Sequence, residues 1–202
     1  MILKNKLSLN DSHELAREEE RISKKRALEL FDADKLHDKA PGSFASLSYI
    51  HQFLFGDIYD FVGTIRTKDI SKSGFRFASV LYLEESLVKI EAMPQSTFEE
   101  IVKKYVEMNV AHPFREGNGR SMRIWLDQML KAELGLVIDW KLIDKQDYLL
   151  AMERSPIKDT EIKTLLKAAL TDRINDREVY MKGLDASYAY EGYTIFQTED
   201  LS

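Results

Sequence analysis

Glycine and proline, the residues that most often interrupt helices, are scarce in this chain. It has nine glycines and four prolines in 202 residues, about half of the roughly 12% that the pair usually contributes. Leu, Lys, Glu and Ala, which favour helices, are abundant. The sequence therefore predicts an all-α fold. A length of 202 residues fits one domain covering 1–202.

The overall charge and composition exclude several classes of protein. The net charge is −5, so the chain shows no basic footprint for nucleic acid. No apolar run is long enough for a membrane span, and the N-terminus lacks the pattern of a signal peptide. There are no cysteines, which excludes disulfides, thiolate metal sites and cysteine nucleophiles. A cytoplasmic location is expected.

Capping residues and apolar spacing locate the helices. Asp11 with Glu14 is a capping box, and the charge run 18–26 that follows is expected to be a solvated helix face. The apolar stretch 47–58 predicts a central helix ended by Gly63. Ser96 with Glu99 is a second capping box. Further helices are expected at 83–91, from 96 to 111, from about 120 to 134, at 144–152 and at 159–170.

A short hairpin is expected at about 65–78. Lys72, Ser73 and Gly74 form a turn between β-branched and aromatic residues, which is a hairpin signal. Such a hairpin is either an exposed loop without a role or an edge that pairs with an extended peptide.

The glycines cluster most tightly in the segment 111–123, AHPFREGNGRSMR. Pro113 disfavours a helical conformation at His112, so this histidine is expected at a helix exit. Gly117 and Gly119 let the backbone turn so that its amides face one point. A helix is expected to begin near residue 120, which would make this point an anion site.

The charged side chains around this loop suit a polyphosphate. Arg120 and Arg123 are three residues apart and therefore neighbours on one helix face, and guanidinium groups bind phosphates well. Glu116 could hold a metal that bridges phosphates. His112 could be a general base. A zinc pair of His112 and Glu116 lacks a third ligand.

The segment resembles the signature of Fic-domain proteins, His-Pro-Phe-x-(Asp/Glu)-Gly-Asn-Gly-Arg-x-x-Arg, and matches each specified position between residues 112 and 123. The region of about 45–170 is similar to the helical core of the family, and the hairpin at 65–78 to its flap. The resemblance implies transfer of AMP from ATP to a Tyr, Ser or Thr hydroxyl of a target protein. The presence of Gly119 favours AMP transfer over phosphate transfer.

The resemblance also implies a role for each residue of the loop. His112 would be the base, Phe114 the anchor of the loop, and Glu116 the Mg²⁺ ligand. The Gly117 to Gly119 amides would form the anion hole, with Asn118 helping to place the α-phosphate. Arg120 would bind the β-phosphate region and Arg123 the γ-phosphate. In the flap, Ile70, Gly74 and Phe75 would hold the target segment.

A second motif lies at about 185–193, where Ser187 and Glu191 are followed by Gly192. Taken alone, it could be a surface helix that ends at a glycine. It resembles the inhibitory motif (Ser/Thr)-x-x-x-Glu-(Gly/Asn) that some Fic proteins, class III, carry on a C-terminal helix. The resemblance implies that Glu191 pairs with Arg123 and blocks the γ-phosphate. We expect Tyr188 to be the first candidate for self-modification.

Several alternatives stay open at this point. The same site could serve another nucleotidyl transfer, removal of AMP, or nucleotide binding without catalysis. The expected partners are ATP, an unknown target protein and, because an inhibitory helix must be released, a second copy of the chain.

Overall fold

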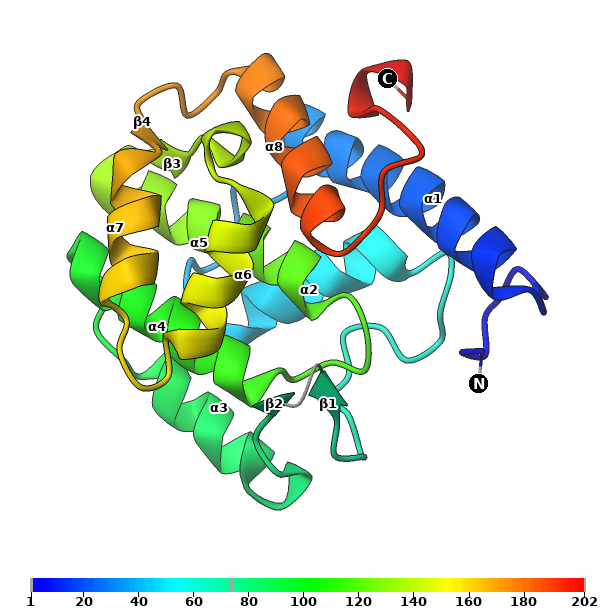
Figure 1. Ribbon diagram of the computed structural model, residues 1–202, viewed down its shortest axis with the longest axis horizontal. Coiled ribbons are helices and arrows are strands. Elements are labelled where there is room, and N and C mark those ends of the chain that lie inside the picture. Colours follow the sequence, from blue (N-terminus) through cyan, green and yellow to red (C-terminus); the bar gives the residue numbers. More distant parts are fainter. Residues whose placement is uncertain (1, 73–74, 202) are drawn as a thin grey trace.

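The computed structural model describes residues 2–72 and 75–201 and is built mainly from helices (Figure 1). This confirms the all-α prediction with a small hairpin. Within the described ranges, no helix is long and apolar enough to cross a membrane. The α-helices are α1 (Ser12–Asp32), α2 (Phe44–Phe55), α3 (Leu83–Glu91), α4 (Phe98–Ala111), α5 (Asn118–Leu134), α6 (Lys145–Arg154), α7 (Thr160–Ala168) and α8 (Arg177–Tyr190).

Short elements connect these helices. Strands β1 (Ser71–Lys72) and β2 (Phe75–Arg76) form the expected antiparallel hairpin, while Gly74 lies outside the described residues. A second antiparallel pair, β3 (Val137–Ile138) with β4 (Leu170–Thr171), was not predicted from the sequence. The 3₁₀ helices are η1 (Val80–Tyr82), η2 (Trp140–Leu142) and η3 (Thr198–Leu201).

The helix boundaries follow local capping. The Asp11 side chain accepts hydrogen bonds from the first turn of α1, as predicted. The second capping box lies one residue later than expected, with Thr97 and Glu100 as its members. The prediction that the central helix runs to Gly63 is wrong, because α2 ends at Phe55. The chain then turns at Gly56 and runs irregularly toward the hairpin.

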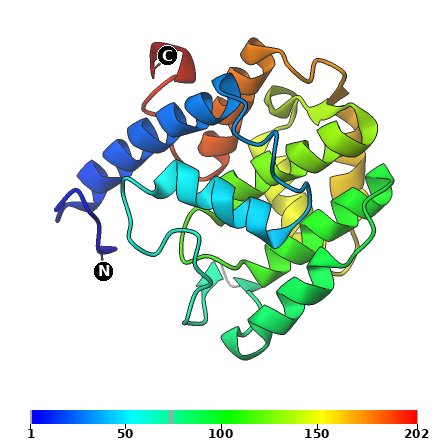
Figure 2. The same cartoon turned by 180° about the vertical axis from the view of Figure 1, so that it is seen from behind.

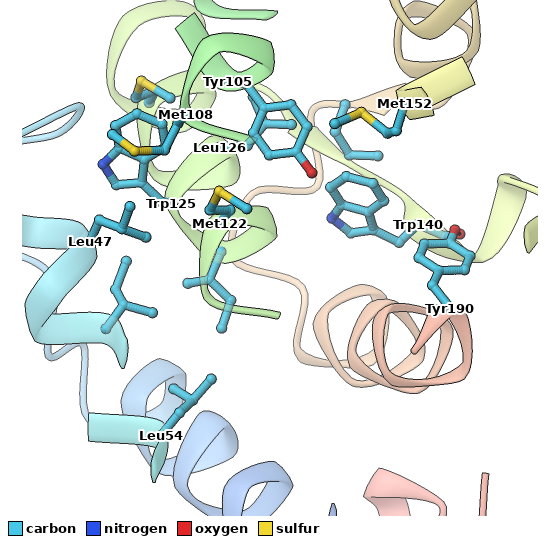
Figure 3. Close-up of a cluster of buried hydrophobic side chains, with 14 of the residues drawn as sticks. Leu47, Leu54, Tyr105, Met108, Met122, Trp125, Leu126, Trp140, Met152 and Tyr190 are labelled. Atoms are coloured by element: carbon cyan, nitrogen blue, oxygen red, sulfur yellow. The ribbon is translucent and has the colours of Figure 1, made fainter. Parts of the chain in front are cut away.

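Helix α5 is the centre of the hydrophobic core (Figure 3). Its residues Met122, Trp125 and Leu126 are fully buried and lie among side chains of α2 and α4. Trp140 and Tyr190 extend the same core toward α8. Because α5 is enclosed on several sides, the core holds its N-terminal end in place.

Helix α1 lies beside both α2 and α8, as two opposite views show (Figures 1 and 2). The expected solvated face at 18–26 is wrong in part, because Glu19, Glu20 and Lys24 are almost completely buried. Buried charges are costly unless they are paired. Glu19 pairs with Arg120 of α5, whereas Glu20 and Lys24 pair with each other and with the C-terminal part of the chain.

The partners hold α8 against α1. Lys24 forms ion pairs of 3.1 Å with Glu20 and with Asp185 of α8. The Glu20 carboxylate also accepts the backbone N–H groups of Ile195 and Phe196. The segment after α8 is therefore fastened to α1, and this fastening sets the position of the end of α8.

Candidate active site

The loop of residues 112–117 joins α4 to α5 and is turned by two residues with positive φ. His112 caps the end of α4 with φ 49°, and Gly117 precedes α5 with φ 76°. The histidine thus lies at a helix exit, as the following proline predicted. Helix α5 begins at Asn118, about two residues earlier than expected. The first N–H groups of this helix have no partner within the helix, and a helix end of this kind suits an anion.

Phe114 and Asn118 brace the loop from inside. The Phe114 ring is fully buried and stacks on the His51 ring at 3.9 Å between centroids. This bears out its predicted role as an anchor. The Asn118 amide accepts the N–H of Phe114 at 2.8 Å and donates to the carbonyl of Phe114 at 2.7 Å. Both ends of the Asn118 side chain are thus used within the loop.

His51 supports the same loop, although no role was predicted for this residue. Its Nδ1 accepts the N–H of Gly63 at 2.9 Å, so its Nε2 donates to the carbonyl of Glu116 at 2.8 Å. Burial lowers the pKa of His51 to about 4, which keeps the ring neutral and this tautomer fixed. A histidine within the apolar run 47–58 was the only signal for this role.

The His112 ring lies at the rim of the loop in a defined orientation. Its Nδ1 is 3.3 Å from the carbonyl of Asn109. Because a carbonyl only accepts, the proton lies on Nδ1, and in the neutral ring Nε2 carries the lone pair. The ring of Phe77 stacks on that of His112 at 3.7 Å and 17°. This tautomer suits a base that acts through Nε2.

Arg120 is buried in an aromatic cage. Its guanidinium carbon lies 4.7 Å from the ring centroid of Phe55 and 4.5 Å from that of Tyr193. Its Nη1 forms a 2.7 Å ion pair with Glu19 of α1. Although burial opposes this, Arg120 and hydrogen bonds from Tyr59 and Tyr193 lower the pKa of Glu19. The role of Glu19 was not predicted, because this residue lies within a charge run.

Arg123 is held by the end of α8. Its Nε donates to Ser187 Oγ at 2.7 Å, and its Nη2 donates to the Ser187 carbonyl at 2.8 Å and to Glu191 Oε1 at 3.1 Å. On its other side, Nη1 donates to the Tyr148 hydroxyl at 3.3 Å. Arg123 itself is 2% exposed. The structure therefore brings Ser187, Glu191 and Arg123 together.

The Glu191 carboxylate lies directly against the start of α5. A methyl group added at Gly119 would collide with Glu191 Oε1 and approach Arg123 Nη1 to 3.0 Å. An acidic side chain thus occupies the place where the N-terminus of α5 and Arg123 converge, which is where both favour an anion.

Helix α8 is longer than the predicted segment 185–193, since it begins at Arg177 and ends at Tyr190. Tyr188 is fully buried on it, and its hydroxyl donates to Ser23 Oγ of α1 at 2.8 Å. Burial raises the pKa of Tyr188 to about 12. While α8 is docked, this hydroxyl has no access to a nucleotide.

The hairpin lies next to His112. The Phe77 N–H donates to the carbonyl of Ile70 at 3.3 Å, and the ring of Phe75 packs edge-on against that of Phe77 at 5.1 Å. Ile70 and Phe75 are half-buried. These two predicted flap residues therefore lie on the element that covers the His112 ring.

The fold and the loop together define a class: an all-α protein in which a glycine-bracketed loop enters a buried central helix that carries two arginines. Residues 42–130 of this chain match the Fic/DOC family. This range includes α2, the hairpin, α3, α4 and most of α5, so the central part of the chain is similar to a Fic domain.

Curated relatives show the same likeness. The chain is 27% identical to "Protein adenylyltransferase VbhT" of Bartonella schoenbuchensis over 96% of its own length, but spans only 45% of that protein. It is 25% identical to "Probable protein adenylyltransferase Fic" of Salmonella typhimurium over 85% of its length and 88% of that protein.

Solved structures show the same fold. The Bartonella tribocorum effector protein BepC, solved with bound AMPPNP, has a TM-score of 0.71 at 22% identity and covers 85% of this chain and 93% of its own. The Fic domain of Bep8 from Bartonella sp. 1-1C has a TM-score of 0.72 at 20% identity, covering 86% and 92%.

Proposed function

We propose that this chain is a protein adenylyltransferase that moves AMP from ATP to a Tyr, Ser or Thr hydroxyl of a target protein. The family, the adenylyltransferase names of the curated relatives and the intact loop from His112 to Arg123 support this function. The observation that carries it is the geometry at the start of α5, where the Glu191 carboxylate lies against Gly119 and pairs with Arg123.

The reaction needs one base and a site for the phosphates. A target hydroxyl oxygen would bond to the α-phosphorus as the bond from that phosphorus to the α–β bridging oxygen breaks. His112 Nε2 would take the hydroxyl proton, and pyrophosphate would leave in line. The N–H groups at Gly117 to Gly119 would stabilise the charge that develops on the α-phosphate oxygens, because they are fixed by the loop before the reaction begins.

The arginines would bind the rest of the triphosphate. Arg123 would hold the γ-phosphate and Arg120 the β-phosphate region. In the docked state Arg120 is 1% exposed, so a phosphate could reach it only after the side chains that cover it, Tyr193 among them, move. Asn118, whose amide is used within the loop, would act on the α-phosphate through its backbone N–H and by keeping the loop in shape.

Glu116 suits a magnesium ion that arrives with the nucleotide. Mg²⁺ usually binds one or two carboxylates together with substrate phosphates. The Glu116 side chain is 43% exposed beside the anion site, with Oε1 accepting the Gly117 N–H at 3.0 Å. Among the described residues, no group of three acidic, His or Cys side chains could hold a metal alone. Bound there, the ion would neutralise phosphate charge.

The end of α8 would inhibit the enzyme. Glu191 occupies the space that a γ-phosphate on Arg123 needs, and Ser187 holds the same guanidinium from the side. ATP would bind productively only when this contact is broken. Self-modification at Tyr188 would follow release of α8 and would prevent its return, since the hydroxyl could no longer reach Ser23. Peptide mapping of the active protein for AMP on Tyr188 tests this.

The hairpin would receive the target. An extended target segment could pair with the edge formed by Ile70 to Phe77, which would place its hydroxyl beside His112. In this arrangement Ile70 and Phe75 would contact the target, and the same would hold for Gly74.

The test uses wild type, Glu191→Gly and His112→Ala with Mg²⁺, ATP labelled at the α-phosphate, and a bacterial lysate as a pool of acceptors. We expect weak labelling of protein for wild type, strong labelling for Glu191→Gly and none for His112→Ala. Equal labelling by wild type and Glu191→Gly would contradict inhibition by Glu191. A binding module without catalysis would give no label with any variant.

A further inference from the structure

Arg66 lies between the irregular segment after α2 and the catalytic loop, and its side chain is 2% exposed. Its guanidinium donates to four backbone carbonyls. Two belong to the flanks of the hairpin, Lys68 at 2.9 Å and Ala78. The other two end α4, Ala111 at 3.1 Å and His112 at 2.8 Å.

This is an unusual environment for a buried cation. Its only ion pair among the described residues is Asp69, whose oxygen is 3.9 Å away and whose side chain is 39% exposed. Burial lowers the pKa of Arg66. The negative ends of four carbonyl dipoles face the guanidinium. A neutral apolar side chain would fill this space without the cost of burying a charge, so the arginine is explained by the carbonyls that it joins.

The hairpin depends on such support. Each of its strands has two residues, and an isolated hairpin of this size is not stable in water. The residues that Arg66 binds, Lys68 and Ala78, stand at the two ends of the hairpin. Two backbone bonds act in parallel with it: the Ala78 N–H donates to Val110 at 2.9 Å, and the Arg66 N–H donates to Pro113 at 2.8 Å.

The hydrogen bonds of Arg66 also support His112, the proposed base. Phe77, which stacks on the His112 ring, directly precedes Ala78, and the carbonyl that Arg66 holds on the other side is that of His112 itself. We propose that Arg66 is a positioning residue that fixes the Phe77 ring on the His112 ring and so sets the direction of Nε2.

Proton NMR tests the contact between the Phe77 and His112 rings, and it needs no target protein. A proton near the face of an aromatic ring is shifted upfield, so the His112 Cε1–H signal should report the stack with Phe77. The chain has only four histidines, and His112→Ala assigns the signal. Phe77→Leu gives the value expected when the stack is lost.

The variant is Arg66→Lys, which keeps the charge but cannot reach four carbonyls at once. The matched control is Arg76→Lys on the same hairpin, where the arginine side chain is 78% exposed. We expect the His112 signal in Arg66→Lys to move most of the way to the Phe77→Leu value, and that in Arg76→Lys to stay at the wild-type value. The His51 signal should not move, since its contacts are separate.

An unchanged His112 signal in a folded Arg66→Lys protein would overturn the proposal. Arg66→Gln is the second variant, and unfolding of both variants would also overturn it, because Arg66 would then support the whole fold rather than the position of one ring.

The consequence for catalysis rests on the proposed function and is measured separately. In the Glu191→Gly background, Arg66→Lys should lower the rate of labelling by on the order of tenfold or more, because misplaced groups lose effective molarity. The affinity for ATP should stay within about twofold, since no phosphate-binding residue contacts Arg66. If Glu191→Gly itself transfers no label, the proposed function fails while the His112 signal still decides the role of Arg66.

Discussion

The contact between Arg123 and Glu191 makes a quantitative prediction about nucleotide affinity. Both side chains are largely buried, with 3% and 17% of their surfaces exposed, and their atoms are 3.1 Å apart. A hydrogen bond to a charged group contributes ~1.5–3 kcal/mol. ATP must break this contact to place its γ-phosphate on Arg123. Glu191→Gly should therefore bind ATP about 10- to 100-fold more tightly than wild type.

Glu191→Gln separates the charge from the shape of the side chain. The amide can still accept from Arg123, but it lacks the negative charge of the carboxylate, so this contact is weaker than the ion pair. We expect an affinity between those of wild type and Glu191→Gly. Glu178→Gln, an exposed change on the same helix, is the matched control and should behave like wild type.

Calorimetry measures these affinities. It uses Mg²⁺ and an ATP analogue with a methylene group between the α- and β-phosphorus, which prevents turnover. AMP, which has no γ-phosphate, should bind the variants and wild type alike. If Glu191→Gly binds the analogue no more tightly than wild type, Glu191 does not compete with the γ-phosphate. If AMP gains as much affinity as the analogue, the effect comes from release of α8 as a whole.

Three further predictions concern α5 and its neighbours. In Gly119→Ala the added methyl group would displace Glu191, but it would fill the same anion site. We therefore expect no gain in affinity for the analogue, and tight binding by calorimetry would contradict this. Tyr148→Phe removes the hydroxyl that Arg123 bonds and, in the Glu191→Gly background, should weaken the analogue by up to about tenfold. Burial raises the pKa of Asp127 to about 7, so its contribution to stability should be lost as the pH rises from about 4 through 7; thermal unfolding of Asp127→Asn should lack this part of the pH dependence.

The helices and the loop of residues 112–117 could be predicted because their signals are local. Capping residues lie within one turn of the helix that they start, and glycine at 117 adopts a positive φ without steric cost. The position of His112 at a helix exit followed from the proline next to it in the chain.

The supports of the loop could not be predicted in the same way. Glu19 meets Arg120 across about a hundred residues of sequence, and it lies in a charge run that usually faces solvent. Arg66 looks like any exposed arginine in the sequence, because its partners are backbone carbonyls, which every residue has. The role of His51 could not be predicted for the same reason, since its ring also bonds to backbone groups.

The end of α8 could be predicted from the sequence only in part. The spacing of Ser187 and Glu191 pointed to Arg123 only through the family resemblance, since the pattern alone fits an ordinary helix end. Its docking depends on Lys24 and Asp185, a pair that joins distant parts of the chain. Local pattern could thus predict the contact, but not what holds it in place.

The group that this chain transfers decides between AMP transfer and phosphate transfer. Glu191→Gly is incubated with Mg²⁺ and the acceptor pool, in parallel with ATP labelled at the α-phosphate and ATP labelled at the γ-phosphate, and again with His112→Ala added to the variant. We expect protein to retain the α-label only, and this label to disappear with His112→Ala. Retention of the γ-label, or an α-label that persists without His112, would contradict this.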